Sequence, residues 1–273
     1  MTFSIIVVCM NAGEKLHETI KSILSQTETD YEVVIKDGGS TDGSLEALEP
    51  NEKFRVYSMP DEGIYDAMNQ AIRRSQGDYI CFLNCGDYFY DEMVLQRVKN
   101  RIAHKKSSRP VIFYGNIYER KTGAVVQSNP VLDEFARYRN LPCHQACFYE
   151  RELFAIRVFD TTYRVRADYE HFMWSLYKKN ARAVYMPFTA VSYEGGGYSE
   201  SKEGRRRSGW EHRQIVAKYM SKKKVWQYRM IMLLTLSPLR TWAAENPATA
   251  GMYQEIKKKI YKGRKQSKAK EKR

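Results

Sequence analysis

The chain has 273 residues, of which 43% are hydrophobic and 13% aromatic, enough for the packed core of one large domain with appendages or of two small ones. The net charge of +13 is uneven: ten Lys and Arg residues against one Glu give Ile256–Arg273 a charge of +9 and leave +4 for the rest. The apolar run Met230–Leu236 is far shorter than the roughly 20 residues of a membrane-spanning helix, and no charged signal-peptide segment opens the chain. We therefore expect a protein that is made and kept in the cytoplasm.

Five cysteines, an odd number, predict free thiols in a reducing compartment. The pairs Cys81/Cys85 and Cys143/Cys147 each have three residues between them, with His144 inside the second pair, so zinc is an alternative. Structural zinc sites usually have tighter pairs on loops, and Cys81 lies in an apolar run where a small buried thiol is the ordinary explanation. We favour thiols over zinc.

The basic end of the chain suggests an anionic partner. A membrane surface and nucleic acid are both compatible with it, and so is a solvated, disordered end that aids solubility. The charge is terminal and no nucleic-acid-binding motif accompanies it, which weighs against nucleic acid.

The first residues alternate between strand and helix patterns. An apolar, β-branched run over Phe3–Asn11 predicts a strand, and apolar residues at helical spacing then predict a helix that ends near Gln26. A second strand is expected over Tyr31–Ile35, a short helix over Ser44–Leu48, and a third strand over Phe54–Ser58. This alternation predicts right-handed, parallel βαβ units and an α/β fold.

The segment Asp37–Gly43, after the second strand, is rich in glycine like a phosphate-binding loop. No Walker lysine follows it, and the first strand is not followed by the G-x-G-x-x-G dinucleotide pattern. P-loop and nicotinamide sites are therefore weak interpretations. An aspartate at the end of a strand is still well placed to accept hydrogen bonds from a base N–H or a ribose hydroxyl.

The chain is organised around Asp61–Asp87. Apolar residues at helical spacing from Ile64 to Ile72 predict a helix, and Tyr79–Leu83 is a continuous apolar run typical of a strand buried on both faces. The run ends in Asn84–Asp87, a turn that carries a carboxylate. Ligands of open α/β sheets bind just beyond the carboxyl ends of the strands, so Asp87 is expected to face a metal ion or a phosphorylated ligand. A simple surface turn is the alternative.

Three segments together resemble the inverting family 2 glycosyltransferases, in particular those of bacterial capsule and exopolysaccharide synthesis. They are FSIIVVCMNAG, EVVIKDGGSTDGS, and DEGIYDAMNQAI with GDYICFLNCGD, in the family's order and spacing over roughly the first ninety residues. The resemblance implies the A-type glycosyltransferase fold. We therefore expect a mixed, mostly parallel sheet with flanking helices, a Rossmann-like nucleotide-binding half, and a C-terminal helical extension.

The resemblance also implies which residues bind a sugar-nucleotide donor. Asn11 and Asp37 would lie near the nucleoside. Asp61, Asp66 and Asn69 would line the donor pocket around the ribose and the sugar.

Asn84 and Asp87 fall where the family carries its acidic metal-binding motif. Family members commonly have two or three acidic residues there, whereas only Asp87 remains here, beside Asn84 and Gly86. An amide oxygen is a weaker ligand than a carboxylate, but Mg²⁺ or Mn²⁺ also accepts substrate phosphates and water. We expect one of these ions at Asp87, with Asn84 as a further ligand.

The second half is less regular. It predicts a helix over Asp91–His104, a strand over Val111–Asn116, a hairpin between residues 118 and 127, a strand in Pro142–Tyr149 and a short helix from Arg151. His144 in this part is expected to contact the donor diphosphate or the acceptor, and a structural histidine is the alternative.

Asp168–His171 opens an aromatic-rich helix that extends to Lys179. The resemblance places the family's catalytic base in this segment, and Asp168 is the match. Asp168 and Glu170 are two apart on a helix and do not share a face, so at most one of them points into the cleft. Capping of the helix is the alternative role of Asp168.

The last strands are expected over Ala183–Met186 and Ala190–Tyr193. The glycine-rich segment Glu194–Ser199 then suits a lid that closes over donor and acceptor. A helix with Arg205–Arg207 and Trp210 follows, either as a solvated basic face or in reach of a substrate phosphate.

We expect residues 1–220 to form the catalytic domain, with 1–116 as its donor half and 117–220 as its acceptor half, and residues 221–273 to form a helical, basic extension. Aromatic, apolar and basic residues mix from Lys222 to Trp242, and Asn246-Pro247 is a good helix start. This composition suits a region that lies on an anionic membrane surface. Packing on the catalytic domain is the alternative.

The combined prediction is a non-processive, inverting glycosyltransferase of the hexosyltransferase type, acting in cell-surface polysaccharide synthesis. It would move a sugar from a nucleotide-diphosphate sugar, UDP-linked, to a lipid-linked saccharide at the cytoplasmic membrane face. The Q-x-x-R-W segment of processive synthases is absent. The alternatives are a nucleic-acid-binding protein with a basic tail and a sugar-nucleotide-binding protein that has lost catalysis.

Overall fold

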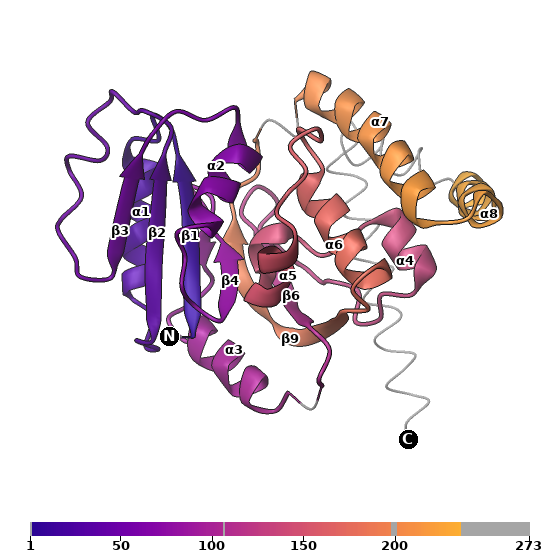
Figure 1. Cartoon of the computed structure of the whole chain (residues 1–273), viewed down its shortest axis with the longest axis horizontal. Helices are drawn as coiled ribbons and strands as arrows, with labels where there is room; N and C mark the ends of the chain where they lie inside the picture. The colour runs from indigo at the N-terminus through magenta and orange to yellow at the C-terminus, as the bar shows by residue number, and fades with distance from the viewer. Residues whose placement is uncertain (1, 106, 198–200, 236–273) are drawn as a thin grey trace. The chain divides into compact units, whose positions relative to one another are not determined.

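A computed structural model describes residues 2–105, 107–197 and 201–235 (Figure 1). The chain divides into two units, Met1–Tyr219 and Met220–Arg273. The helix predicted at Asn246-Pro247 and the basic stretch Ile256–Arg273 lie outside the described residues.

Among the described residues, the first unit contains one nine-stranded sheet. Its strands are β1 Phe3–Cys9, β2 Tyr31–Asp37, β3 Phe54–Ser58, β4 Tyr79–Phe82, β5 Tyr88–Phe89, β6 Val111–Glu119, β7 Ala124–Val126, β8 Cys147–Glu150 and β9 Arg182–Tyr193. Their order is β3-β2-β1-β4-β8-β6-β9-β5, and β7 pairs with β6. The four strands from β3 to β4 are parallel, whereas β8 is antiparallel to both of its neighbours. The sheet is therefore mixed: the first half of the chain supplies four parallel strands, as predicted, and β6 and β9 form a further parallel pair.

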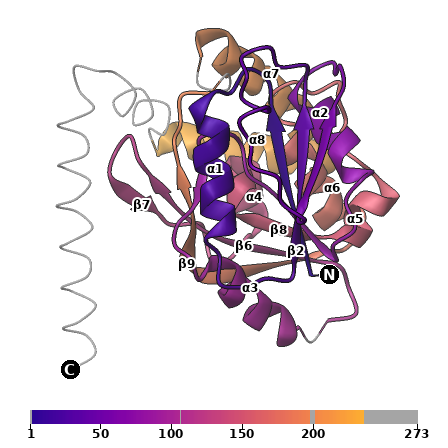
Figure 2. The same ribbon diagram turned by 90° about the vertical axis from the view of Figure 1, so that its left-hand side faces the viewer.

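Helices cover both faces of this sheet. They are α1 Glu14–Leu24, α2 Ile64–Ile72, α3 Val94–Ala103, α4 Glu134–Arg139, α5 Arg151–Ile156, α6 Ala167–Tyr177 and α7 Lys202–Tyr219, with a 3₁₀ turn over His144–Ala146. Figure 2 shows the first strands between α1 on one side and α2 on the other. In the second unit, α8 spans Lys222–Leu234.

The alternation of side chains along β1 explains this layering. Phe3, Ile5 and Val7 point to one face of the sheet, where they pack with apolar residues of α1 and α3 and are fully buried. The opposite face is aromatic: the ring of Phe82 stacks on that of His144 at 4.6 Å and lies 5.4 Å from that of Phe159. The sheet is thus buried on both sides, which is what continuous apolar strands require.

The parallel registers bring the carboxyl ends of three strands to one edge. Phe3 is paired with Tyr31 of β2 and with Tyr79 of β4. The pairing continues to Cys9 opposite Asp37, and Leu83, just after β4, donates its N–H to the Ile6 carbonyl at 2.9 Å. The turns that follow β1, β2 and β4 therefore lie side by side, as the α/β prediction requires.

Two predicted elements in the first half of the chain are wrong in part. Ser44–Leu48 forms turns and no helix, because the Asp42 carboxylate accepts hydrogen bonds from the Ser44 N–H at 3.1 Å and hydroxyl at 2.6 Å. Such local bonds compete with a helix that is too short to offset its own nucleation. The helix expected from Asp91 begins only at Val94, since the Asp91 carboxylate binds the N–H of Met93 at 2.9 Å and holds a turn.

The two strands predicted last are one strand, β9. It pairs with β6 from Arg182 to Tyr193, and its register shifts beside Asn116. These irregularities absorb the extra residues around Pro187 without ending the strand. The predicted hairpin is present, with β7 paired to the end of β6.

A substitution at Gly77 tests the close approach of the chain to β1. A Cβ atom there would lie 2.5 Å from the backbone carbon of Phe3 and from the backbone nitrogen of Ser4. We expect Gly77→Ala to lower the free energy of unfolding by about 1–3 kcal/mol, because backbone atoms must move to make room. Urea unfolding followed by circular dichroism measures the change.

The matched control is Gly209→Ala in α7, where a Cβ atom would meet only the Arg213 guanidinium, at 4.0 Å. Alanine is favoured over glycine inside a helix, so this variant should be neutral or more stable by up to about 1 kcal/mol. Equal stability of the two variants would show that the approach at Gly77 is not tight.

Candidate active site

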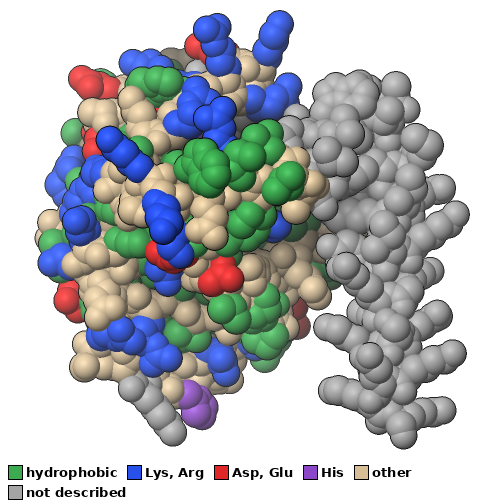
Figure 3. Space-filling model, turned by 90° about the vertical axis from the view of Figure 1, so that its right-hand side faces the viewer, with side chains coloured by type: hydrophobic (Ala, Val, Ile, Leu, Met, Phe, Trp, Pro, Cys, Tyr) green, Lys and Arg blue, Asp and Glu red, His purple; other side chains and the backbone are tan. Residues whose placement is uncertain are grey.

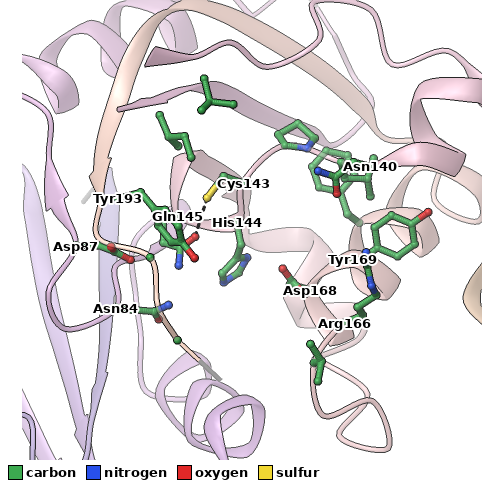
Figure 4. Close-up of a pocket in the computed structure, with 18 of the residues that line it drawn as sticks. Asn84, Asp87, Asn140, Cys143, His144, Gln145, Arg166, Asp168, Tyr169 and Tyr193 are labelled. Atoms are coloured by element: carbon green, nitrogen blue, oxygen red, sulfur yellow. Dashed lines mark hydrogen bonds between the residues drawn. The ribbon is translucent and has the colours of Figure 1, made fainter. Parts of the chain in front are cut away.

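A cavity of about 760 Å³ lies beyond the carboxyl end of β4. Its lining includes Asn84 and Asp87 from the turn after β4, His144 from the 3₁₀ turn, and Asp168 from the start of α6. Figure 4 shows Asp87 and Asp168 on opposite sides of this space, with His144 between them. The fold thus brings together four of the predicted site residues.

Asp168 is held by a residue that the sequence analysis did not identify. The Tyr65 hydroxyl donates to Asp168 Oδ1 at 2.8 Å and lies 2.9 Å from the Val165 carbonyl oxygen. Burial, together with the negative charge of Asp168, raises the pKa of Tyr65 well above its ordinary value. The phenol therefore keeps its proton and acts as a donor that orients the carboxylate. Tyr65 lies beside Ile64 on α2, and both line the cavity.

The segment that precedes Asp168 is fixed by a buried carboxylate. Glu211 of α7 accepts hydrogen bonds from three consecutive backbone N–H groups, those of Arg164, Val165 and Arg166, at 2.9, 3.0 and 2.9 Å. It is fully buried and also binds Arg207 Nε at 2.9 Å. Charge-assisted bonds of this kind are among the strongest in proteins. The start of α6 is therefore held in one position relative to α7.

Glu170 faces away from the cavity. Its side chain is fully buried, 3.0 Å from Arg157 and 2.7 Å from Lys218. Asp168 has no capping bond to α6, whose N-cap residue is Arg166. Of the two carboxylates in the first turn of α6, Asp168 alone lines the cavity.

The oxygen atoms of Asn84 and Asp87 fit a hard divalent cation. Asn84 Oδ1 is buried and has no hydrogen-bond partner among the described residues. Asp87 is 4% exposed, and its Oδ1 accepts the Glu194 N–H at 2.8 Å. Burial raises the pKa of Asp87 to about 6, in part offset by that hydrogen bond and by the charge of Arg120. A Mg²⁺ or Mn²⁺ ion takes oxygen ligands of this type and would stabilise the ionised carboxylate.

Glu194 brings a second carboxylate to the same turn. Its side chain lies against Gly86, where a Cβ atom would clash with Glu194 Oε2, and it forms an ion pair with Lys15 at 2.8 Å. Gly86 has a φ of 94°, which other residues rarely adopt. Gly86 thus has no room for a side chain, and Glu194 occupies the space beside it. The described part of Glu194–Ser199, residues 194–197, lines the cavity.

His144 presents one ring nitrogen to the cavity. Its Nδ1 lies 3.3 Å from the Tyr149 hydroxyl, and its buried Nε2 has no partner among the described residues. Burial lowers the pKa of His144, against the opposing effect of Asp168. The imidazole is therefore neutral at pH 7 and offers a hydrogen bond and no charge.

Asn11 and Asp37 shape the loop after β2. The Asp37 carboxylate accepts the N–H groups of Gly39 at 2.9 Å and Ser40 at 3.0 Å and the Ser58 hydroxyl at 2.7 Å. Burial tends to raise its pKa, but these bonds lower it below the ordinary value. Asn11 has a φ of 50° and accepts the Thr41 N–H at 2.9 Å. Both residues lie at the sheet edge that leads to the cavity, and neither lines it.

The other three predicted donor residues also lie outside the cavity lining. Asp61 pairs with the buried Lys36 at 2.7 Å. Asp66 accepts a hydrogen bond from Gln70 at 2.9 Å. Asn69 is buried, and its amide binds the carbonyl and the N–H of Phe159, both at 2.9 Å. On α2, the cavity is lined instead by Ile64, Tyr65 and Met68.

Within residues 2–105, 107–197 and 201–235, no three His, Cys, Asp or Glu side chains are grouped to hold a metal ion. The five cysteines are free thiols. A search of the same residues finds no helix with the length and hydrophobicity needed to cross a membrane.

Comparison with known proteins finds relatives along most of the chain. Residues 4–158 match the family described as Glycosyl transferase family 2. A PGL/p-HBAD biosynthesis glycosyltransferase from Mycobacterium tuberculosis is 32% identical over 247 residues, which cover 88% of this chain and 90% of the relative. The UDP-Glc:alpha-D-GlcNAc-diphosphoundecaprenol beta-1,3-glucosyltransferase WfaP of Escherichia coli is 30% identical over 149 residues, or 51% of this chain and 57% of WfaP.

Solved structures share the fold. S. aureus TarS 1-349 in complex with UDP-GlcNAc superposes with a TM-score of 0.68 at 17% identity, covering 90% of this chain and 76% of TarS 1-349. The mannosyltransferase PcManGT from Pyrobaculum calidifontis, in complex with GDP-Man and Mn²⁺, gives a TM-score of 0.62 at 18% identity and covers 96% of this chain and 81% of its own. The predicted fold class is confirmed.

The raised pKa of Asp87 predicts a pH-dependent cost in stability. The folded protein binds this proton more tightly than the unfolded chain, so the contribution of Asp87 is fully present below pH 3.8 and is lost as the pH rises through about 6. Asp87→Asn removes that loss. In EDTA at about pH 7.5 the variant should be more stable by about 3 kcal/mol, because one pKa unit corresponds to about 1.4 kcal/mol. Urea unfolding of both proteins between pH 4 and about 7.5 measures this difference in the free energy of unfolding.

Asp78→Asn is the matched control, since Asp78 is exposed and lies at the opposite end of β4. Its unfolding free energy should follow that of the wild type at every pH. An Asp87→Asn curve that runs parallel to the wild-type curve would mean that the carboxylate is not strained by burial.

Proposed function

The chain belongs to glycosyl transferase family 2, as its sequence motifs predicted, and we propose that it is a non-processive, inverting hexosyltransferase. It takes a sugar from a UDP-linked donor and transfers it to a lipid-linked saccharide in the synthesis of a cell-surface polysaccharide or glycolipid. The observation that carries this proposal is the pair of carboxylates across one cavity, Asp168 held by Tyr65 and Asp87 beside Asn84 (Figure 4).

Asp168 is the general base of the proposed reaction. Inversion in one step requires a base on the acceptor side, opposite the leaving diphosphate. Asp168 takes the proton from the acceptor hydroxyl as its oxygen attacks the anomeric carbon of the donor sugar. The hydrogen bond from Tyr65 leaves one carboxylate oxygen for this proton and keeps the group oriented. The hydrogen bonds from the backbone of Arg164–Arg166 to Glu211 keep the start of α6 in position.

The opposite side of the cavity receives the donor diphosphate. A bound Mg²⁺ or Mn²⁺ would neutralise the negative charge of that diphosphate, and Asp87 and Asn84 are the residues that would hold it. Lys15 lies at the same end, paired with Glu194. Neutral His144, between the two carboxylates, donates or accepts one hydrogen bond to the sugar or the diphosphate.

The edge formed by the turns after β1 and β2 receives the nucleoside. The loop held by Asp37 exposes its backbone there, with Asn11 beside it and Asp61 below. Asp66 and Asn69 support this half by fixing α2. Relatives with solved structures support the choice of a nucleotide donor, since TarS 1-349 binds UDP-GlcNAc and PcManGT binds GDP-Man.

The lipid-linked acceptor implies work at a membrane surface on the cytoplasmic side. WfaP is named for an acceptor that carries diphosphoundecaprenol. In the second unit, α8 exposes Trp226 by 66% and Leu234 by 78%, and it begins with three lysines. Figure 3 shows hydrophobic side chains gathered on one face, with many Lys and Arg side chains and several acidic side chains around them. Such a surface attaches peripherally to anionic lipid.

Substitution of the base is the direct test of the mechanism. Asp168→Asn keeps the size of the side chain, so single-turnover transfer at saturating donor should fall about 10²–10⁴-fold while donor affinity stays unchanged. Tyr65→Phe should lower the rate less, since the carboxylate remains but loses its orienting bond. The measurement uses a panel of UDP- and GDP-linked hexoses with purified lipid-linked saccharides.

Glu170→Gln removes the same charge from the same turn of α6 and serves as the control. It should reduce stability, because Arg157 and Lys218 lose their partner, and leave the rate of the folded protein near normal. Transfer that survives Asp168→Asn and collapses with Glu170→Gln would overturn the assignment. A wild-type protein that binds donors and transfers nothing would instead be a sugar-nucleotide-binding protein without catalysis.

Membrane attachment predicts salt-sensitive binding to vesicles. The full chain should sediment with phosphatidylglycerol-containing vesicles more than with phosphatidylcholine vesicles, and added salt should release it. Removal of residues 222–273 should abolish binding, and Trp226→Ala should weaken it. Trp210→Ala in α7, 48% exposed, is the control for loss of an exposed indole. Binding that ignores lipid charge and salt would refute electrostatic attachment.

A further inference from the structure

Three arginines line the end of the cavity that holds Asp168. Arg139 is the last residue of α4, and Arg164 and Arg166 precede α6. Arg139 and Arg164 are exposed, and within the described ranges neither side chain has a hydrogen bond or an ion pair. Arg166 is anchored through Nε to the Ser208 carbonyl at 3.0 Å and hydroxyl at 2.7 Å. Its anchoring leaves the terminal guanidinium nitrogens for another partner.

This end of the cavity has an excess of positive charge. The acidic residues in the described cavity lining are Asp87, Glu194 and Asp168, and the first two lie together at the opposite end. Figure 4 shows Arg166 on the Asp168 side, across from Asp87. Glu211 does not balance the arginines, because three N–H groups and Arg207 already occupy it. Three guanidinium groups and one carboxylate, that of Asp168, leave this end with a net positive charge that a bound anion would balance.

Apolar residues adjoin the arginines on both sides of α4. Leu132 precedes this helix, and Leu141 and Pro142 follow it, all in the cavity lining. Val126 of β7 lines the cavity too, and it is 46% exposed, while Val131 is 67% exposed. Leu132 and Leu141 are only 9% and 8% exposed, so Val126 supplies the solvent-exposed apolar surface of this part of the cavity lining.

We propose that Arg139, Arg164 and Arg166 bind a diphosphate of the acceptor, next to the hydroxyl that Asp168 deprotonates, and that the lipid attached to it leaves the cavity along the exposed side chain of Val126. One guanidinium group can donate two parallel hydrogen bonds to two oxygens of a phosphate. Arginine therefore suits the binding of a diphosphate better than lysine does. This inference rests on the proposed transferase function and specifies its acceptor: a sugar whose lipid diphosphate is recognised by the protein itself.

The position of the arginines separates them from the donor. The donor diphosphate belongs at Asn84 and Asp87, and His144 lies between that end and Asp168. An anion at the arginines would thus bind at the same time as the nucleotide. The acceptor hydroxyl would be placed by its own diphosphate, over Asp168, before attack.

Isothermal titration of the full chain saturated with UDP and Mn²⁺ tests the proposal. The probes are farnesyl diphosphate, farnesol and inorganic pyrophosphate. Farnesyl diphosphate should bind the UDP-saturated protein, and farnesol should not. Arg139→Ala and Arg164→Ala should each weaken binding roughly tenfold, the effect of one lost charge-assisted contact, with the affinity for UDP unchanged. Arg101→Ala on α3, an exposed arginine away from the cavity, is the control.

Other outcomes overturn the proposal or part of it. If the arginine variants lose UDP affinity, or if UDP displaces farnesyl diphosphate, the arginines serve the donor. If neither farnesyl diphosphate nor pyrophosphate binds, no anion subsite exists. If pyrophosphate binds as tightly as farnesyl diphosphate, the subsite takes a free phosphate compound and the lipid part of the proposal is wrong.

These measurements need no turnover, so they separate the subsite from the proposed activity. Asp168→Asn should bind farnesyl diphosphate at least as tightly as the wild type, because a nearby negative charge is removed. Binding that behaves as expected in a protein that transfers no sugar would leave the subsite intact and refute the transferase function. Normal transfer to neutral acceptors, insensitive to Arg139→Ala and Arg164→Ala, would refute the subsite and leave the function intact.

Discussion

Parallel pairing of β1 with β2 and with β4 decides where the chemistry of this protein takes place. Because β1 runs beside both strands in the same direction, the turns that follow the three strands share one edge of the sheet. Phe3, Ile5 and Val7 on one face and Ile6 on the other are at most 1% exposed, so the register cannot slip without exposing them. The loop of Asp37 and the turn of Asp87 are thereby fixed at the same edge, on either side of the turn that follows β1.

The acceptor side of the cavity is built by contacts between distant parts of the chain. Tyr65 reaches Asp168 across 103 residues, and Glu211 binds the backbone of Arg164 across 47. Each contact places a charged or polar group in a buried environment, where an unmade hydrogen bond is costly. The start of α6 can therefore occupy few positions, and the Asp168 carboxylate is oriented by the protein itself. The entropy lost in orienting this side chain is therefore lost when the protein folds and adds nothing to the barrier of a later reaction step.

The two ends of the cavity differ in the charged groups that they offer to a ligand. The Asp87 end offers carboxylate and amide oxygens and a carboxyl group whose pKa is raised to about 6 by burial, an environment that favours a cation. The Asp168 end offers arginines, an environment that favours an anion. In the proposed mechanism, a diphosphate would be bound through a divalent ion at the Asp87 end and through guanidinium groups at the Asp168 end. Donor and acceptor would then be distinguished although both carry the same kind of group.

The sequence alone determined the order of strands and helices in the first half, the turn at Asp87, the family, and Asp168 as the residue of the second half to examine. The order of the elements and the turn follow from the spacing of apolar residues and from turn chemistry, which are properties of neighbouring residues. The family and Asp168 came instead from the resemblance of whole segments to the family. Only the tertiary structure showed that Asp61, Asp66 and Asn69 have partners away from the cavity, and that Tyr65 and Glu211 act on the start of α6. Ser44–Leu48 forms no helix because the Asp42 side chain accepts a hydrogen bond from Ser44 and stabilises a turn there. A contact across a hundred residues depends on how helices pack on the sheet, and no local pattern encodes it.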